Sequence, residues 1–167
     1  MARSVVWTAI FALVAGILQS TLLGRLAVYG TVPDLALGIL IYSAYLNGTM
    51  TGQLAGFCSG ILLDFLSASP LGLNALLRTL LGAACGLVRG AFFLDALFLP
   101  MALAAGATFG KALILLALHF LFSGAVPAYR LFEPVLWTEL LLNITTAPLL
   151  FFFLRHFNPL LSVRREN

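Results

Sequence analysis

Long apolar runs separated by short polar turns occupy most of this chain. A helix that crosses a bilayer needs about 20 mostly apolar residues. Six runs approach or reach that length, and each is continuous rather than alternating, which favours helices over strands. The runs cover residues 5–23, 32–46, 50–66, 71–88, 101–122 and 135–154. We therefore predict an all-α, polytopic membrane protein with six transmembrane helices in a single integral membrane domain, residues 1–167.

Composition supports the same fold class. Of the 167 residues, 62% are hydrophobic and only 9% are charged, whereas a soluble domain carries roughly 25% charged residues. A surface with so little charge requires lipid as its surroundings. The formal net charge of +3 does not indicate nucleic-acid binding, because the basic residues are scattered near the ends of the runs and form no basic stripe.

The distribution of arginine predicts how the chain is oriented. An even number of spans places both termini on one side, and the side richer in Lys and Arg is normally cytoplasmic. One side carries five arginines and the other carries two: Arg3, Arg89, Arg155, Arg164 and Arg165 against Arg25 and Arg130. We therefore expect both termini in the cytoplasm, with the turn at residues 47–49 inside and the segment 123–134 outside.

Small and polar residues recur every four positions along the third and fourth runs. Residues four apart share one helix face, and the short turn containing Pro70 and Gly72 makes the two helices antiparallel neighbours. Small residues at such a face permit close approach of two helices in lipid. The two stripes are Gly52, Gly56, Gly60 and Asp64, and Asn74, Arg78, Gly82, Gly86 and Gly90.

The register of this hairpin suggests an ion pair. Folding it about residue 69 places Gly60 level with Arg78, so that Arg78 can extend past the glycine toward Asp64. The same register pairs Gly56 with Gly82 and Gly52 with Gly86. Pairing lowers the cost of placing a charge in the membrane. Two interpretations stay open: a packing device with a structural ion pair, and a polar hairpin end that faces a partner or ligand.

Lys111 is an intramembrane charge in the middle of the fifth run. Its candidate partners are Asp64, Glu139 or the lipid phosphates. The sequence contains no HExxH, CxxC, P-loop or GxSxG pattern. Cys58 and Cys85 both lie inside apolar runs, where free cysteines act as small hydrophobes. We therefore expect no catalytic site, metal site or cofactor, and no enzymatic activity.

Two segments resemble a known family. Residues 56–76, GFCSGILLDFLSASPLGLNAL, and residues 32–37, VPDLAL, are similar to the bacterial rod-shape-determining MreD family. The resemblance implies a non-enzymatic scaffold of the cell-elongation machinery in the cytoplasmic membrane, which organises lateral peptidoglycan synthesis. It implies MreC as the main partner, with RodA, a class B penicillin-binding protein and MreB in the wider complex. The implied fold is similar to the substrate-binding subunits of energy-coupling-factor transporters.

That similarity of fold supplies an alternative function: a vitamin- or metal-binding transporter subunit. Such subunits contact their scaffold through an Ala-x-x-x-Ala pair in the first span, and the nearest match here is Ala12 and Gly16. A secondary transporter is disfavoured, because intramembrane acids are scarce and no internal repeat is evident. If the two glycine stripes pack on each other, the first span with Ala12 and Gly16 is the expected surface for a partner.

Overall fold

The computed structural model describes residues 1–27, 30–67, 69–90, 97–122 and 133–163. Within these ranges every secondary-structure element is a helix, which confirms the all-α fold class. One helix of at least 13 residues falls on each of the six apolar runs. In chain order the elements are α1 (Ala2–Thr21), η1 (Leu23–Leu26), α2 (Leu35–Asn47), α3 (Thr49–Leu66), α4 (Leu73–Leu87), α5 (Phe98–Leu121), α6 (Pro134–His156) and α7 (Asn158–Leu161).

Three of the described helices, α1, α5 and α6, are long and apolar enough to cross a membrane. Helices α2 and α4 are apolar but shorter. The chain is thus a membrane protein with at least these candidate spans. Most of the 123–134 segment, together with Arg130, Arg164 and Arg165, lies outside the described residues.

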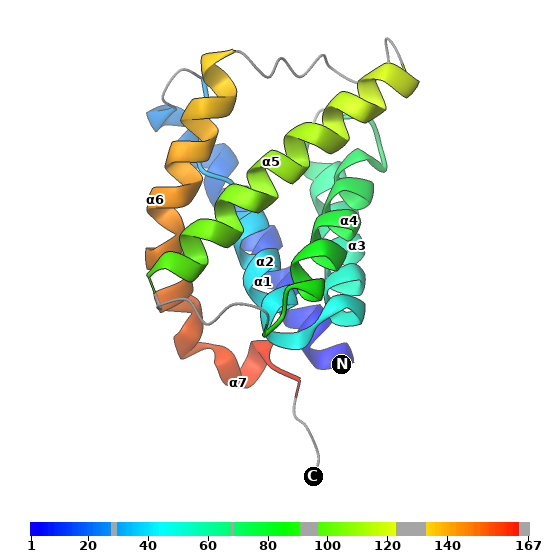
Figure 1. Ribbon diagram of the computed structural model, residues 1–167, viewed down its shortest axis with the longest axis vertical. Coiled ribbons are helices and arrows are strands. Elements are labelled where there is room, and N and C mark those ends of the chain that lie inside the picture. Colours follow the sequence, from blue (N-terminus) through cyan, green and yellow to red (C-terminus); the bar gives the residue numbers. More distant parts are fainter. Residues whose placement is uncertain (28–29, 68, 91–96, 123–132, 164–167) are drawn as a thin grey trace.

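The helices form a bundle in which α3 and α4 lie together on one side, α6 lies on the opposite side and α5 crosses obliquely in front (Figure 1). The short helix α7 packs against the start of α1, where the Ser4 hydroxyl donates to the Leu161 carbonyl. Asn47 at the end of α2 donates to the same carbonyl over 2.7 Å. The beginning of α1 and the end of α6–α7 therefore share one end of the bundle.

Helix α2 forms the centre of the core. Its apolar side chains point in all directions and are almost completely buried, with Leu37, Leu40 and Ile41 between 0% and 2% exposed. A helix that is apolar all round is stable only when other helices surround it, and α2 contacts α1, α3, α4, α5 and α6. Gly48, with φ of +91°, ends α2 and allows the chain to reverse directly into α3.

The outward faces are strongly apolar. Large exposed side chains include Val14 on α1, Phe57 on α3, Leu113 on α5 and Phe152 on α6. In water such a surface would associate, since soluble monomers expose only limited apolar patches. A lipid environment removes this penalty, so the surface agrees with the membrane assignment.

Candidate functional site

The glycines of α3 and α4 bring two backbones into direct contact. A Cβ added at any of five glycines would lie less than 3.0 Å from backbone atoms of the opposite side of the hairpin. These glycines are Gly52, Gly56, Gly60, Gly82 and Gly86. No residue with a side chain fits there unless the helices separate. The two stripes are therefore buried against each other along the length of the hairpin.

The observed register differs from the predicted one by one helical turn. Gly52 lies against Gly82, Gly56 against Arg78 and Gly60 against Asn74 and Ala75. Helix α3 extends past the level at which α4 begins, and the connecting turn runs back beside it. In that turn Pro70 accepts a hydrogen bond from Leu73 over 3.1 Å, and Gly72 adopts a φ of +92° at the N-cap of α4.

Asp64 explains this register. Its carboxylate accepts hydrogen bonds from the backbone N–H groups of Gly72, Asn74 and Ala75 at 3.0 to 3.1 Å, and from the Asn74 amide at 3.1 Å. Gly72, the N-cap residue of α4, has no side chain that could cap the helix. Asp64 of α3 therefore accepts hydrogen bonds from the free N–H groups at the start of α4, where a negative charge is favourable. The predicted ion pair between Asp64 and Arg78 is wrong, because this carboxylate is committed to the helix terminus.

Arg78 instead pairs with Asp34, the N-cap residue of α2. The Arg78 Nη2 lies 3.1 Å from Asp34 Oδ1, and the Lys111 Nζ lies 3.4 Å from Asp34 Oδ2. Lys111 also lies 2.6 Å from Glu139 Oε1, so of its three candidate partners Glu139 is observed and Asp64 is not. Among the described residues, the network joins α2, α4, α5 and α6 through two cations and two carboxylates.

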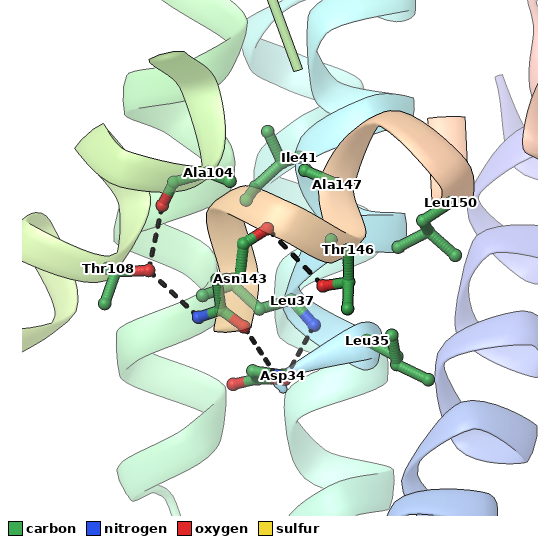
Figure 2. A pocket seen from close by; sticks show the side chains of 11 residues that line it. Asp34, Leu35, Leu37, Ile41, Ala104, Thr108, Asn143, Thr146, Ala147 and Leu150 are labelled. Carbon is green, nitrogen blue, oxygen red and sulfur yellow. Dashed lines mark hydrogen bonds between the residues drawn. The ribbon is translucent and has the colours of Figure 1, made fainter. Parts of the chain in front are cut away.

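The network is embedded in further hydrogen bonds around Asp34 (Figure 2). The Asp34 backbone N–H donates to Asn143 Oδ1 over 2.7 Å, and the Asn143 amide donates to Thr108 over 3.0 Å. Asp34 Oδ1 also accepts from the Leu37 N–H over 2.9 Å, which caps α2. The small cavity beside these groups has a volume of about 10 Å³, which leaves room for no substrate.

This arrangement is suited to holding helices rather than to chemistry. Each carboxylate of the network already binds a cation, and the described members carry two positive and two negative formal charges. Among the described residues, no three His, Cys, Asp or Glu side chains are grouped so that they could hold a metal ion. The described interior therefore contains a balanced set of ion pairs and one capped helix terminus.

A model of the rod shape-determining protein MreD family matches residues 1–157 of the chain. The chain belongs to the MreD family. The match extends over nearly the whole sequence, well beyond the hairpin and the second run that carried the resemblance. No curated protein and no solved structure matches the chain significantly.

Several residues of this MreD-family site were missed by the sequence analysis. Asp34 was recognised as part of the family-like VPDLAL segment but not as the partner of Arg78. Asn143 and Thr108, which hold the Asp34 backbone, lie in the middle of apolar runs. The sequence feature that could have identified them is a polar side chain inside an apolar run, because a polar group within the membrane needs a hydrogen-bonding partner. Which partner it has depends on how four helices far apart in the sequence are placed.

Proposed function

We propose that this protein is a non-enzymatic scaffold of the bacterial cell-elongation machinery in the cytoplasmic membrane. It binds MreC and thereby organises lateral peptidoglycan synthesis, with RodA, a class B penicillin-binding protein and MreB in the wider complex. Membership of the MreD family assigns the chain to rod-shape determination. The buried ion network is the observation that carries the finer proposal, because it uses the intramembrane charges to fix four helices.

The packing restricts where a partner can bind. The glycine stripes of α3 and α4 face each other, so they are not open to a partner helix. The expected partner surface on α1 is wrong, because Ala12 is 0% exposed and Gly16 faces the Leu63 side chain of α3. MreC therefore binds one or more of the outward faces, which present the large apolar side chains named above.

We further propose that all six long helices span the membrane, with both termini cytoplasmic. Helices α2 and α4 are short, at 13 and 15 residues. Helix α2 is surrounded by five other helices, and α4 packs along the longer α3. The shared end of α1 and α7 agrees with an even number of crossings. Reporter fusions after residue 167 and in the turn 47–49 should be cytoplasmic, and a periplasmic C-terminus would contradict this topology.

The transporter-subunit alternative is weaker for this chain. Of the expected contact pair on the first helix, Ala12 is fully buried and Gly16 packs against the Leu63 side chain of α3. The cavity between Asp34 and Asn143 has a volume of only about 10 Å³. The scaffold proposal accounts for both features without requiring a transported ligand.

Depletion of the protein in a rod-shaped bacterium tests the proposal. We expect rounded cells, restoration of rod shape by the wild-type protein, and no restoration by any added vitamin or metal salt. A strain depleted and supplied with an empty vector is the matched control. Recovery of rod shape by a nutrient alone would contradict the scaffold proposal and support the transporter subunit.

A further inference from the structure

A cavity of about 260 Å³ lies between the start of α5 and the end of α6, at the end of the bundle that also holds the start of α1 (Figure 1). Much of its wall is apolar or aromatic, including Tyr42, Leu99, Phe151 and Phe152. The rings of Tyr42 and Phe151 meet edge to face, with their centroids 4.9 Å apart. The Tyr42 hydroxyl donates to the Asn158 side chain, which lies in the same wall. The aromatic part of the wall is therefore held in place by contacts of its own.

Among the described residues that line this cavity, only Arg155 is charged. It is exposed, unlike Arg78, and it forms no ion pair with any described residue. Arg155 is the last residue but one of α6, a candidate membrane span of 23 residues. A helix of that length measures about 34 Å, slightly more than the roughly 30 Å of the hydrocarbon core of a bilayer. Arg155 therefore lies near the depth of the lipid head groups.

The described charges are distributed unequally between the two ends of the bundle. The end where α2 and α6 begin holds all four described acidic residues, Asp34, Asp64, Glu133 and Glu139. The opposite end carries three arginines, Arg3, Arg89 and Arg155. Within the described chain this second end thus offers cations and no carboxylates. It is therefore complementary in charge to a negatively charged ligand.

We propose that this cavity binds the head group of an anionic membrane phospholipid. Guanidinium donors match the oxygens of a phosphate, so Arg155 binds the phosphate. Phe152 lies three residues earlier on the same face of α6 and is 81% exposed, so it contacts the glycerol and the first acyl carbons. The neighbouring arginines disfavour a head group that carries its own cation, such as choline. This inference does not depend on binding of MreC.

The test uses the purified, delipidated protein in detergent and measures its thermal unfolding midpoint. Dioctanoyl phosphatidylglycerol is compared with dioctanoyl phosphatidylcholine, which has the same chains and phosphate but no net charge, and with inorganic phosphate. We expect saturable stabilisation by phosphatidylglycerol, because a ligand that binds the folded state stabilises it. The apparent affinity for phosphatidylcholine should be weaker by about fivefold or more.

Three results would overturn the proposal. Equal stabilisation by the two lipids would show that the negative charge is not recognised. Stabilisation by inorganic phosphate equal to that by phosphatidylglycerol would show that the ligand is a free phosphate compound. No effect of either lipid would leave the cationic end of the bundle to an acidic segment of a protein.

Two pairs of variants locate the binding. Arg155→Gln should weaken the apparent affinity for phosphatidylglycerol by about fivefold or more, whereas Arg3→Gln removes an exposed arginine at the same end but outside the cavity wall and should bind nearly normally. Phe152→Ala removes part of the apolar wall and should also weaken binding. Phe153→Ala, at an adjacent position that is 57% exposed and outside the wall, is its control. Wild-type binding by both Arg155→Gln and Phe152→Ala, or equal losses in the controls, would show that the cavity is not the site.

Discussion

Helix α4 packs on two neighbours in opposite ways. Against α3 it forms the most extensive contact of the bundle, with glycine backbones touching along the hairpin. Against α5 the contact is sparse, and between them lies a cavity of about 340 Å³ lined by small and apolar residues such as Ala84, Ala102 and Gly106. A Cβ added at Gly106 would meet nothing within 4 Å.

The difference shows that glycines spaced four residues apart do not have the same structural role on every helix of this chain. On α3 and α4 the glycines remove side chains so that backbones meet, which is how helices associate in lipid. On α5 Gly106 borders open space. Helices α4 and α5 are joined through Asp34, which binds both Arg78 and Lys111. Apolar contacts add to this link, with Leu77 beside Leu115 and Gly110 beside Leu81.

The largest effect should come from placing a side chain between α3 and α4. Gly56→Leu introduces a side chain against the Arg78 backbone. We expect a loss of stability greater than the roughly 3–5 kcal/mol of a broken buried ion pair, because backbone cannot move aside as a side chain can. Folded protein extracted from membranes, measured by size-exclusion chromatography, should be largely lost. Phe57→Leu, at the adjacent outward-facing position, is the matched control and should accumulate normally.

An intermediate effect should come from removing the carboxylate that joins α4 and α5. Asp34→Asn leaves the buried Arg78 without its ion pair, and breaking a buried pair costs about 3–5 kcal/mol. In a double-mutant cycle of thermal stability, Asp34→Asn and Arg78→Gln should be strongly coupled, because each removes the other's partner. Asp64→Asn with Arg78→Gln is the control cycle. Coupling in the control but not in the Asp34 cycle would contradict the Asp34–Arg78 pair and support the ion pair between Asp64 and Arg78 that the sequence suggests.

The smallest effect should come from filling the space beside α5. Gly106→Leu has room for its side chain and gains helix propensity, so we expect the stability to change by no more than about 1 kcal/mol. Size-exclusion profiles of the variant should match the wild type. Loss of folded protein comparable to that of Gly56→Leu would show that α4 and α5 close together, and would erase the contrast between the two interfaces.

The packing of α3 on α4 was predicted only in part from the sequence. The four-residue spacing of small residues predicted which faces of α3 and α4 meet, because that pattern is local to each helix. It did not predict the register, since an acid near the end of α3 can bind either a cation on α4 or the free N–H groups that begin it. Asp64 binds the free N–H groups at the start of α4, because Gly72 has no side chain to cap that helix.

The partner of Arg78 could not be predicted from the sequence, for a different physical reason. Asp34 is 44 residues away in the chain and meets Arg78 only after α2 is surrounded by five helices. The same packing places Lys111 against Glu139 and Asn143 against Thr108. Such contacts depend on tertiary placement, which hydropathy and spacing do not specify, although the need of each buried polar group for a partner was visible.

Photo-crosslinking to MreC in living cells tests the scaffold account most directly. A photoreactive phenylalanine analogue is placed singly at outward positions on four helices, Val14, Phe57, Leu113 and Phe152, in variants that fold and maintain rod shape. We expect a crosslink to MreC from at least one of these faces and none from the others, because a partner covers a defined surface. Absence of MreC crosslinks from all four faces, in cells that remain rod-shaped, would contradict the account.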